Sequence, residues 1–127
     1  MATKIIWQEK GILFVHSETV TVEEVLEANN AMYGDPRFDS IEYQISDYTG
    51  VTSNLITFSD ARVVGKLDNT SSVWNPKMLI AIVSTDEDFH PVIQKYFESF
   101  QKQGWKGGIF NTLGEAYKWI EEMKLLT

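Results

Sequence analysis

The residues best placed to do chemistry are carboxylates that follow two apolar runs. Asp47 ends the run at residues 41–47, and Asp86 and Asp88 follow the run at residues 77–84. If both runs are parallel strands, their carboxyl ends meet at one edge of the sheet, where ligands bind in open α/β folds. Three carboxylates at that edge could hold Mg²⁺ and support phosphoryl acceptance or hydrolysis.

A second interpretation gives these carboxylates structural roles. Asp47 can accept hydrogen bonds from the amides of Thr49 and Gly50 in a turn, and the segment from Asp86 to Asp88 can cap the helix that follows it. A phosphoryl-accepting site also needs a lysine at the end of the next strand, but that run ends in the letters FNT. The sequence therefore favours a protein that is not an enzyme, with metal-assisted chemistry at these carboxylates as the alternative.

Other catalytic patterns have little support in the sequence. The two histidines, His16 and His90, lack the spacing of paired metal ligands. No Gly-x-Ser-x-Gly turn is present to position a nucleophilic serine. The chain contains no cysteine, which excludes disulfides and thiolate chemistry. We expect neither a metal nor another cofactor.

Aromatic side chains outside the periodic segments indicate a binding surface. Trp74 lies in the polar segment DNTSSVWNPK, and Tyr48 and Phe89 follow two of the expected strands. Such rings can line an apolar pocket or anchor a protein partner. Together with Asp47 and Thr49, they are predicted to bind a ligand or partner at the ends of the third and fourth strands. The alternative for Trp74 is that its loop folds the indole over the sheet edge.

Composition and charge restrict the class of protein. A chain of 127 residues with 43% hydrophobic residues is expected to form a single domain over residues 1–127. A net charge of −7 argues against binding to nucleic acid. No apolar run reaches the roughly 20 residues of a membrane span, and polar residues interrupt the N-terminal runs. We expect a cytoplasmic protein that is not transmembrane.

Short apolar runs alternate with amphipathic segments along the chain. Strands are predicted at residues 4–9, 12–17, 41–47, 77–84 and 105–111. Helices are predicted at residues 22–33, 58–67, 91–104 and 112–126, the third of them ending at Gly104. Capping boxes are predicted for three of these helices, in the pairs Thr21 with Glu24, Thr57 with Asp60, and Thr112 with Glu115.

The order of these segments predicts an α/β fold. It is β-β-α-β-α-β-α-β-α, in which the first two strands form an antiparallel hairpin and the others are joined through helices. Strands joined by helices lie parallel with right-handed crossovers. We therefore expect a five-stranded mixed, mostly parallel sheet with four helices.

Two segments carry a resemblance to a known family. The letters YGDPRFDSIEYQISDYTGVT and GIFNTLGEAYKWI resemble the SpoIIAA-like family, bacterial single-domain proteins whose fold is related to STAS domains and more loosely to CRAL-TRIO lipid-binding domains. The resemblance covers nearly the whole chain and rests on fold motifs. It implies a cytoplasmic regulatory or binding role, and the lipid-binding relatives make an apolar ligand one expectation.

The same resemblance implies a phosphorylation site. STAS anti-anti-sigma proteins are phosphorylated on a serine near the start of the helix after their third strand, where the phosphate meets a helix N-terminus and blocks a partner. Ser59 is the nearest positional counterpart, with Ser53 and Thr57 as weaker candidates. Asp60 directly follows Ser59 and would repel a phosphate, and Thr57 is more simply a helix cap.

The sequence thus predicts a non-enzymatic domain that recognises a partner protein or a small apolar ligand. A homodimer is a further prediction, because the first strand is expected at a sheet edge and Trp74 is expected to be exposed.

Overall fold

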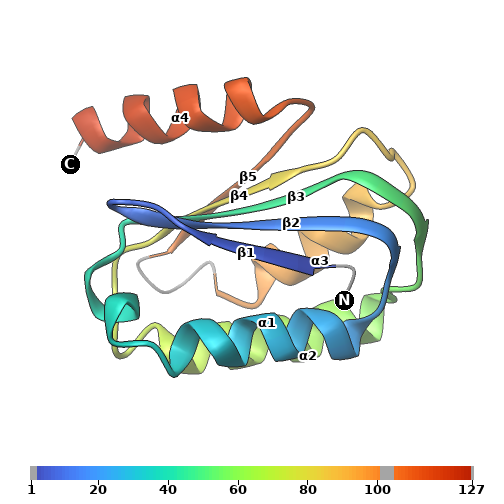
Figure 1. Ribbon diagram of the computed structural model, residues 1–127, viewed down its shortest axis with the longest axis horizontal. Helices are drawn as coiled ribbons and strands as arrows, with labels where there is room; N and C mark the ends of the chain where they lie inside the picture. The colour runs from blue at the N-terminus through green and yellow to red at the C-terminus, as the bar shows by residue number, and fades with distance from the viewer. Residues whose placement is uncertain (1–2, 101–104, 127) are drawn as a thin grey trace.

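A five-stranded sheet separates one helix of the protein from the other three (Figure 1). The computed structural model describes residues 3–100 and 105–126. The strands are β1 (Thr3–Trp7), β2 (Gly11–Val20), β3 (Tyr43–Asn54), β4 (Leu79–Val83) and β5 (Lys106–Phe110). The helices are α1 (Val22–Tyr33), α2 (Phe58–Ser71), α3 (His90–Glu98) and α4 (Leu113–Leu125), with a short 3₁₀ helix η1 (Pro36–Ser40).

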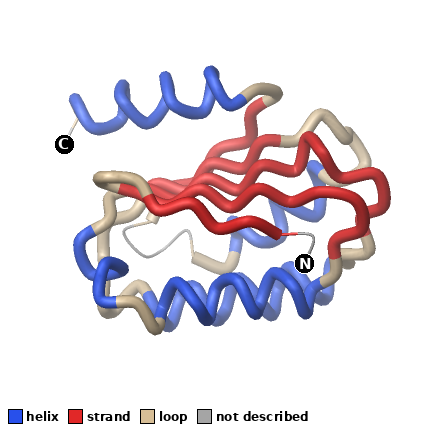
Figure 2. The backbone as a smooth tube through the Cα atoms, viewed as in Figure 1, coloured by secondary structure: helices blue, strands red, loops and turns tan. Residues whose placement is uncertain are grey.

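The strands lie in the sheet in the same order as in the chain. β1 pairs antiparallel with β2, and the remaining neighbours pair in parallel. Helices that connect parallel neighbours by right-handed crossovers in one direction all fall on the same face. Accordingly α1, α2 and α3 cover one face, and α4 covers the other (Figures 1 and 2). The predicted fold class is therefore confirmed.

The two faces of the sheet carry two separate cores. On the face covered by α4, Ala116 and Ile120 pack with Ile45, Ala81 and Val83. The face covered by the other three helices holds the larger core, which includes most of the buried aromatic side chains. Where β3 pairs with β4, over residues 43–47, helices cover both faces of the sheet, so polar residues in this part of β3 are buried or half-buried.

Strand β3 continues well beyond the end predicted for it. The sequence prediction ended this strand at Asp47, but β3 pairs with β2 as far as the Val20 and Asn54 pair. The pairing is irregular there, and Glu18 has a positive φ of 59°. Residues 49–54, which are rich in hydroxyl side chains and follow the strand predicted at residues 41–47, are thus part of the strand. Their polarity reflects exposure, since β4 stops pairing with β3 at Asp47.

Helix α2 confirms its predicted cap and is longer than predicted. The Asp60 amide donates to the Thr57 hydroxyl at 3.1 Å, and the Thr57 amide donates to the Asp60 carboxylate at 3.0 Å. The helix runs to Ser71 and so includes Asp68, which the predicted helix omitted. At α1 and α4 the threonine hydroxyl accepts an amide hydrogen bond from the third helical residue, which is one of the two hydrogen bonds of the predicted capping box.

The predicted cap of α3 is wrong. Phe89 occupies the N-cap position and makes no side-chain hydrogen bond there. Asp86 instead accepts from the amide of Asp88 at 3.0 Å, and its own amide donates to the Ser84 hydroxyl at 3.2 Å. These bonds stabilise a turn that comes before the helix, so the carboxylates stay outside it. Helix α3 ends at Glu98, before the predicted end at Gly104, which itself lies outside the described residues.

Candidate functional site

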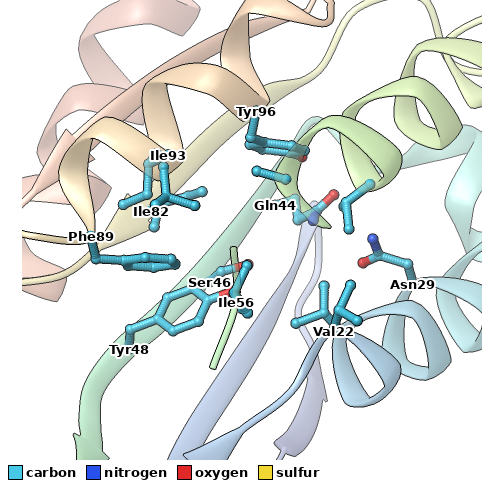
Figure 3. A pocket seen from close by; sticks show the side chains of 14 residues that line it. Val22, Asn29, Gln44, Ser46, Tyr48, Ile56, Ile82, Phe89, Ile93 and Tyr96 are labelled. Carbon is cyan, nitrogen blue, oxygen red and sulfur yellow. The ribbon is translucent and has the colours of Figure 1, made fainter. Parts of the chain in front are cut away.

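A partly open cavity of about 50 Å³ lies between the sheet and the three helices that cover its larger core (Figure 3). Most of its wall is apolar. The sheet contributes Gln44, Ser46, Tyr48 and Ile82. The helices and the residues next to them contribute Val22, Val25, Asn29, Ile56, Ala61, Val64, Phe89, Val92, Ile93 and Tyr96.

Strand alternation places three polar side chains of β3 in this wall. Successive residues of a strand point to opposite faces. Ile45 packs under α4, so Gln44, Ser46 and Tyr48 face the cavity. All three are buried, because β3 lies in the middle of the sheet. Hydrogen-bonding groups are therefore present at the floor of a mostly apolar site.

Gln44 supplies an unpaired acceptor to the cavity. Its side chain is only 3% exposed, and its Oε1 atom has no hydrogen-bond partner among the described residues. A buried acceptor without a partner costs about 1–3 kcal/mol of stability. Figure 3 shows the amide of Asn29, from α1, directed toward the same space. This part of the wall can accept a hydrogen bond from a bound molecule.

Aromatic rings form the end of the cavity near the carboxyl end of β4. Tyr48 and Phe89 meet edge to face, with ring centroids 4.9 Å apart. On its other side Tyr48 stacks on His16 at 4.4 Å, and His16 Nδ1 lies 2.8 Å from the Thr3 hydroxyl oxygen. Tyr48 is thus in contact with both Phe89 and His16 at this end of the cavity.

His16 and Tyr48, at the aromatic end of the cavity, are both uncharged near neutral pH. Burial lowers the pKa of His16 to about 4, although Asp47 acts in the opposite direction. Burial also raises the pKa of Tyr48 above its ordinary value. The cavity therefore presents neutral rings and amides, which suits an uncharged molecule.

A buried carboxyl group stands behind the cavity. Asp68, on the inner face of α2, accepts hydrogen bonds from the hydroxyls of Tyr33 in α1 and Tyr96 in α3. Burial raises the pKa of Asp68 to about 7, and the hydrogen bond from Tyr96 opposes that rise. Tyr96 also lines the cavity. The protonation of Asp68 thus acts on a residue of the cavity wall.

The structure brings together two of the residues predicted from sequence to form a site, Tyr48 and Phe89. Asp47 lies on the opposite side of β3 and accepts from the Thr49 amide at 2.9 Å and from its hydroxyl at 2.7 Å. Thr49 is exposed. Trp74 is 72% exposed and lines a separate hollow.

Ser59 is exposed in the first turn of α2. The neighbouring Asp60 carboxylate is engaged with the Thr57 amide. Phosphorylation of Ser59 stays a prediction.

The carboxylates proposed for metal binding do not form a cluster. Within residues 3–100 and 105–126, no group of three histidine or carboxylate side chains is placed to hold a metal ion. Asp86 and Asp88 lie in the turn before α3, and Asp47 is engaged with Thr49.

Within the described residues, no helix is long and apolar enough to cross a membrane.

Sequence reasoning missed four residues that shape the site, namely Asn29, Gln44, Asp68 and Tyr96. A pattern that could have found Asp68 is its helical spacing from Ala61 and Val64, which places it on the inner face of α2. Gln44 could have been found from the central position of its strand, since a middle strand is buried on both faces.

Neither a protein-family model nor a curated protein sequence matches this chain. Among solved structures, it is similar to a crystal structure of an uncharacterized protein of the DUF3478 family, with a SpoIIAA-like fold, from Shewanella loihica PV-4. The TM-score is 0.51 at 14% sequence identity, and the match covers 94% of this chain and 92% of the other. This likeness over nearly both whole chains, together with the mixed five-stranded sheet and its four helices, shows that the protein has a SpoIIAA-like α/β fold.

Proposed function

We propose that this protein is a non-enzymatic binding domain for a small, uncharged, mostly apolar molecule that carries a hydrogen-bond donor. The observation that carries the proposal is the Oε1 atom of Gln44, which has no hydrogen-bond partner among the described residues and lies in the wall of a mostly apolar cavity. Ligand sites are typically apolar clefts with a few placed polar groups. A donor on the ligand would satisfy Gln44, while its apolar part would contact the rings of Tyr48 and Phe89.

The size of the cavity restricts the part of the ligand that enters it. An engineered apolar cavity of roughly 150 Å³ accommodates benzene. The present cavity, at about 50 Å³, accommodates a fragment of about two non-hydrogen atoms by the same proportion. The remainder of a larger ligand would extend through the open side of the cavity.

The binding test uses two probes of equal size that differ in one donor. Propanol carries a hydroxyl donor, and ethyl methyl ether has the same number of heavy atoms without one. We expect propanol to shift the NMR signals of Gln44 and Tyr48 at lower concentration than the ether does. Native mass spectrometry of gently purified protein should also show a co-purified small molecule. Equal responses to both probes, or no response to either and no added mass, would contradict the proposal.

Replacing Gln44 by leucine is expected to stabilise the protein and abolish this preference. The substitution removes a buried acceptor that no described residue pairs with, so the free energy of unfolding should rise by about 1 kcal/mol. The matched control is Gln8→Leu. The Gln8 amide donates to the Tyr117 hydroxyl at 2.8 Å and accepts from the Tyr43 hydroxyl at 2.5 Å, so the control should lose stability. Urea unfolding of both variants measures the two effects.

The two variants separate the competing explanations of Gln44. If Gln44→Leu destabilises the protein as much as Gln8→Leu does, then Oε1 is paired in the native protein and is not available to a ligand. A stabilised Gln44→Leu variant that still prefers propanol over the ether would place the binding elsewhere.

A further inference from the structure

A hollow separate from the Gln44 cavity lies where η1 meets the ends of α1 and α2. It has a volume of about 280 Å³, and its lining residues are Tyr33, Phe38, Asp39, Ser71 and Trp74. None of these residues lines the first cavity. Three of the five are aromatic, one is a carboxylate, and none carries a positive charge.

Two of the aromatic rings are anchored in the protein. Phe38 is buried, and its ring meets that of Tyr33 edge to face at 5.2 Å. The Tyr33 hydroxyl donates to the buried Asp68, which fixes the position of the Tyr33 ring. These two rings therefore form a rigid wall.

The backbone next to the exposed Trp74 is held in place by the residue that follows it, Asn75. The side-chain amide of Asn75 donates to the carbonyl oxygens of Phe38 and Ile41, each at 2.8 Å. The Asn75 carbonyl in turn accepts from the Trp105 indole at 2.5 Å. These buried bonds tie the loop after α2 to η1. Trp74, which is 72% exposed, lines the same hollow as Phe38.

The charge around this hollow favours a cation. Aromatic faces attract positive charge, and organic ammonium groups are recognised by several rings together with nearby carboxylates. Asp39 supplies the carboxylate, and the chain has a net charge of −7. The nearby Arg37 is already occupied, since its guanidinium bonds to Asp35 at 2.7 Å and lies 4.1 Å from the centre of the Trp7 ring.

We propose that Tyr33, Phe38, Asp39 and Trp74 form a binding site for a methylated ammonium group. Methylation lowers the cost of removing the cation from water, so its positive charge can be placed against the rings. Asp39 adds an attraction that a neutral apolar group would not feel. Such a group occurs on free choline-type molecules and on the side chain of trimethylated lysine, and both share the chemistry that this hollow fits.

The test compares choline with neohexyl alcohol, its neutral isostere in which carbon replaces nitrogen. We expect choline to shift the NMR signal of the Trp74 indole and to bind roughly tenfold more tightly than the alcohol. Equal binding of the two would show a merely apolar hollow and overturn the proposal. Failure of choline and of a trimethyl-lysine peptide to bind would overturn it as well.

Three variants locate the binding. Trp74→Ala should abolish it, and Asp39→Asn should weaken it several-fold. The control is Val73→Ala, which changes an adjacent side chain that is 77% exposed and should leave binding unchanged. Because Trp74 is exposed, its removal should not unfold the protein, and circular dichroism verifies this. Binding that persists in Trp74→Ala would refute the assignment.

Two further ligands show whether the methylated ammonium group belongs to a protein partner or to a small molecule. A trimethyl-lysine peptide that binds at least as tightly as choline, while its unmethylated form does not, would identify a protein partner. Tighter binding of choline or glycerophosphocholine than of the peptide would identify a small molecule. Either result supports the site, and both are independent of the Gln44 cavity.

Discussion

The Asp68→Asn variant is expected to gain stability relative to the wild type as the pH rises from about 4 to about 8. Burial raises the pKa of Asp68 from 3.8 to about 7. Between these values the folded state holds a proton that the unfolded state has lost, so stability falls by roughly 1.4 kcal/mol per pH unit. The contribution is fully present below pH 3.8 and is lost as the pH rises to about 7, for a total on the order of 4 kcal/mol.

His16 has the opposite effect over an overlapping range. Burial lowers its pKa from 6.5 to about 4, so the unfolded state binds the extra proton and stability is lost as the pH falls between these values. In the wild type the contributions of Asp68 and His16 oppose each other. In Asp68→Asn only the His16 contribution remains, so this variant should lose stability as the pH falls. His16→Asn keeps only the Asp68 contribution, so its stability relative to the wild type should change with pH in the opposite direction.

Urea unfolding of the wild type and both variants at about pH 4, 6 and 8 measures these differences. The side-chain amide in Asp68→Asn has one acceptor oxygen, which can pair with the hydroxyl of Tyr33 or of Tyr96 but leaves the other without its bond. The free energy of unfolding of this variant is therefore lowered by about 1 kcal/mol at every pH. Stability profiles of Asp68→Asn and wild type that run parallel across this range would show that Asp68 does not titrate as its burial requires.

The Gly65→Ala variant is expected to destabilise the protein by about 1–3 kcal/mol. A Cβ atom at residue 65 would lie 2.4 Å from Ser99 Cβ and 2.9 Å from the carbonyl oxygen of Tyr96. The second of these is a backbone atom, so α2 and α3 must separate to make room for the methyl group. That separation also moves Tyr96, and we expect NMR signals from the cavity wall to shift.

A second helical glycine provides the matched control. In Gly114→Ala, the nearest atom to the new Cβ is the Thr112 hydroxyl oxygen at 3.8 Å, an ordinary contact. This variant should be neutral or slightly stabilised, because alanine has the higher helix propensity by up to about 1 kcal/mol. Chemical denaturation of both variants compares them. Equal stability of the two would mean that α2 and α3 do not approach as closely as the structure shows.

The fold could be predicted from sequence because its determinants are local. Apolar periodicity and threonine caps indicated the segments, and the order of those segments indicated a mostly parallel sheet. The clearest error was the end of β3. Residues 49–54 have a loop-like composition because they are exposed, yet their pairing with β2 makes them a strand. Pairing with a distant segment is not visible in local composition.

The candidate site was predicted less well than the fold. Tyr48 and Phe89 do lie in contact, because β3 and β4 are neighbours in the sheet, and their role in binding stays a prediction. Gln44 is not recognisable from sequence because it alternates with Ile45. Such alternation is typical of a strand with one face exposed to solvent, and Gln44 would lie on that exposed face. Trp74 was assigned to the same surface as Tyr48, but the bonds of Asn75 hold it at a different one.

The class of fold, the order of its segments and the caps at Thr21, Thr57 and Thr112 follow from the sequence, because they depend on side-chain periodicity and on short-range hydrogen bonds. Three properties follow only from tertiary packing: which polar groups of the described residues are buried without a partner, which carboxyl group has its pKa raised to about 7, and which aromatic rings share a hollow. Those properties depend on helices packing over both faces of the sheet. Burial and pairing arise between segments far apart in the chain, and the residue types alone do not specify them.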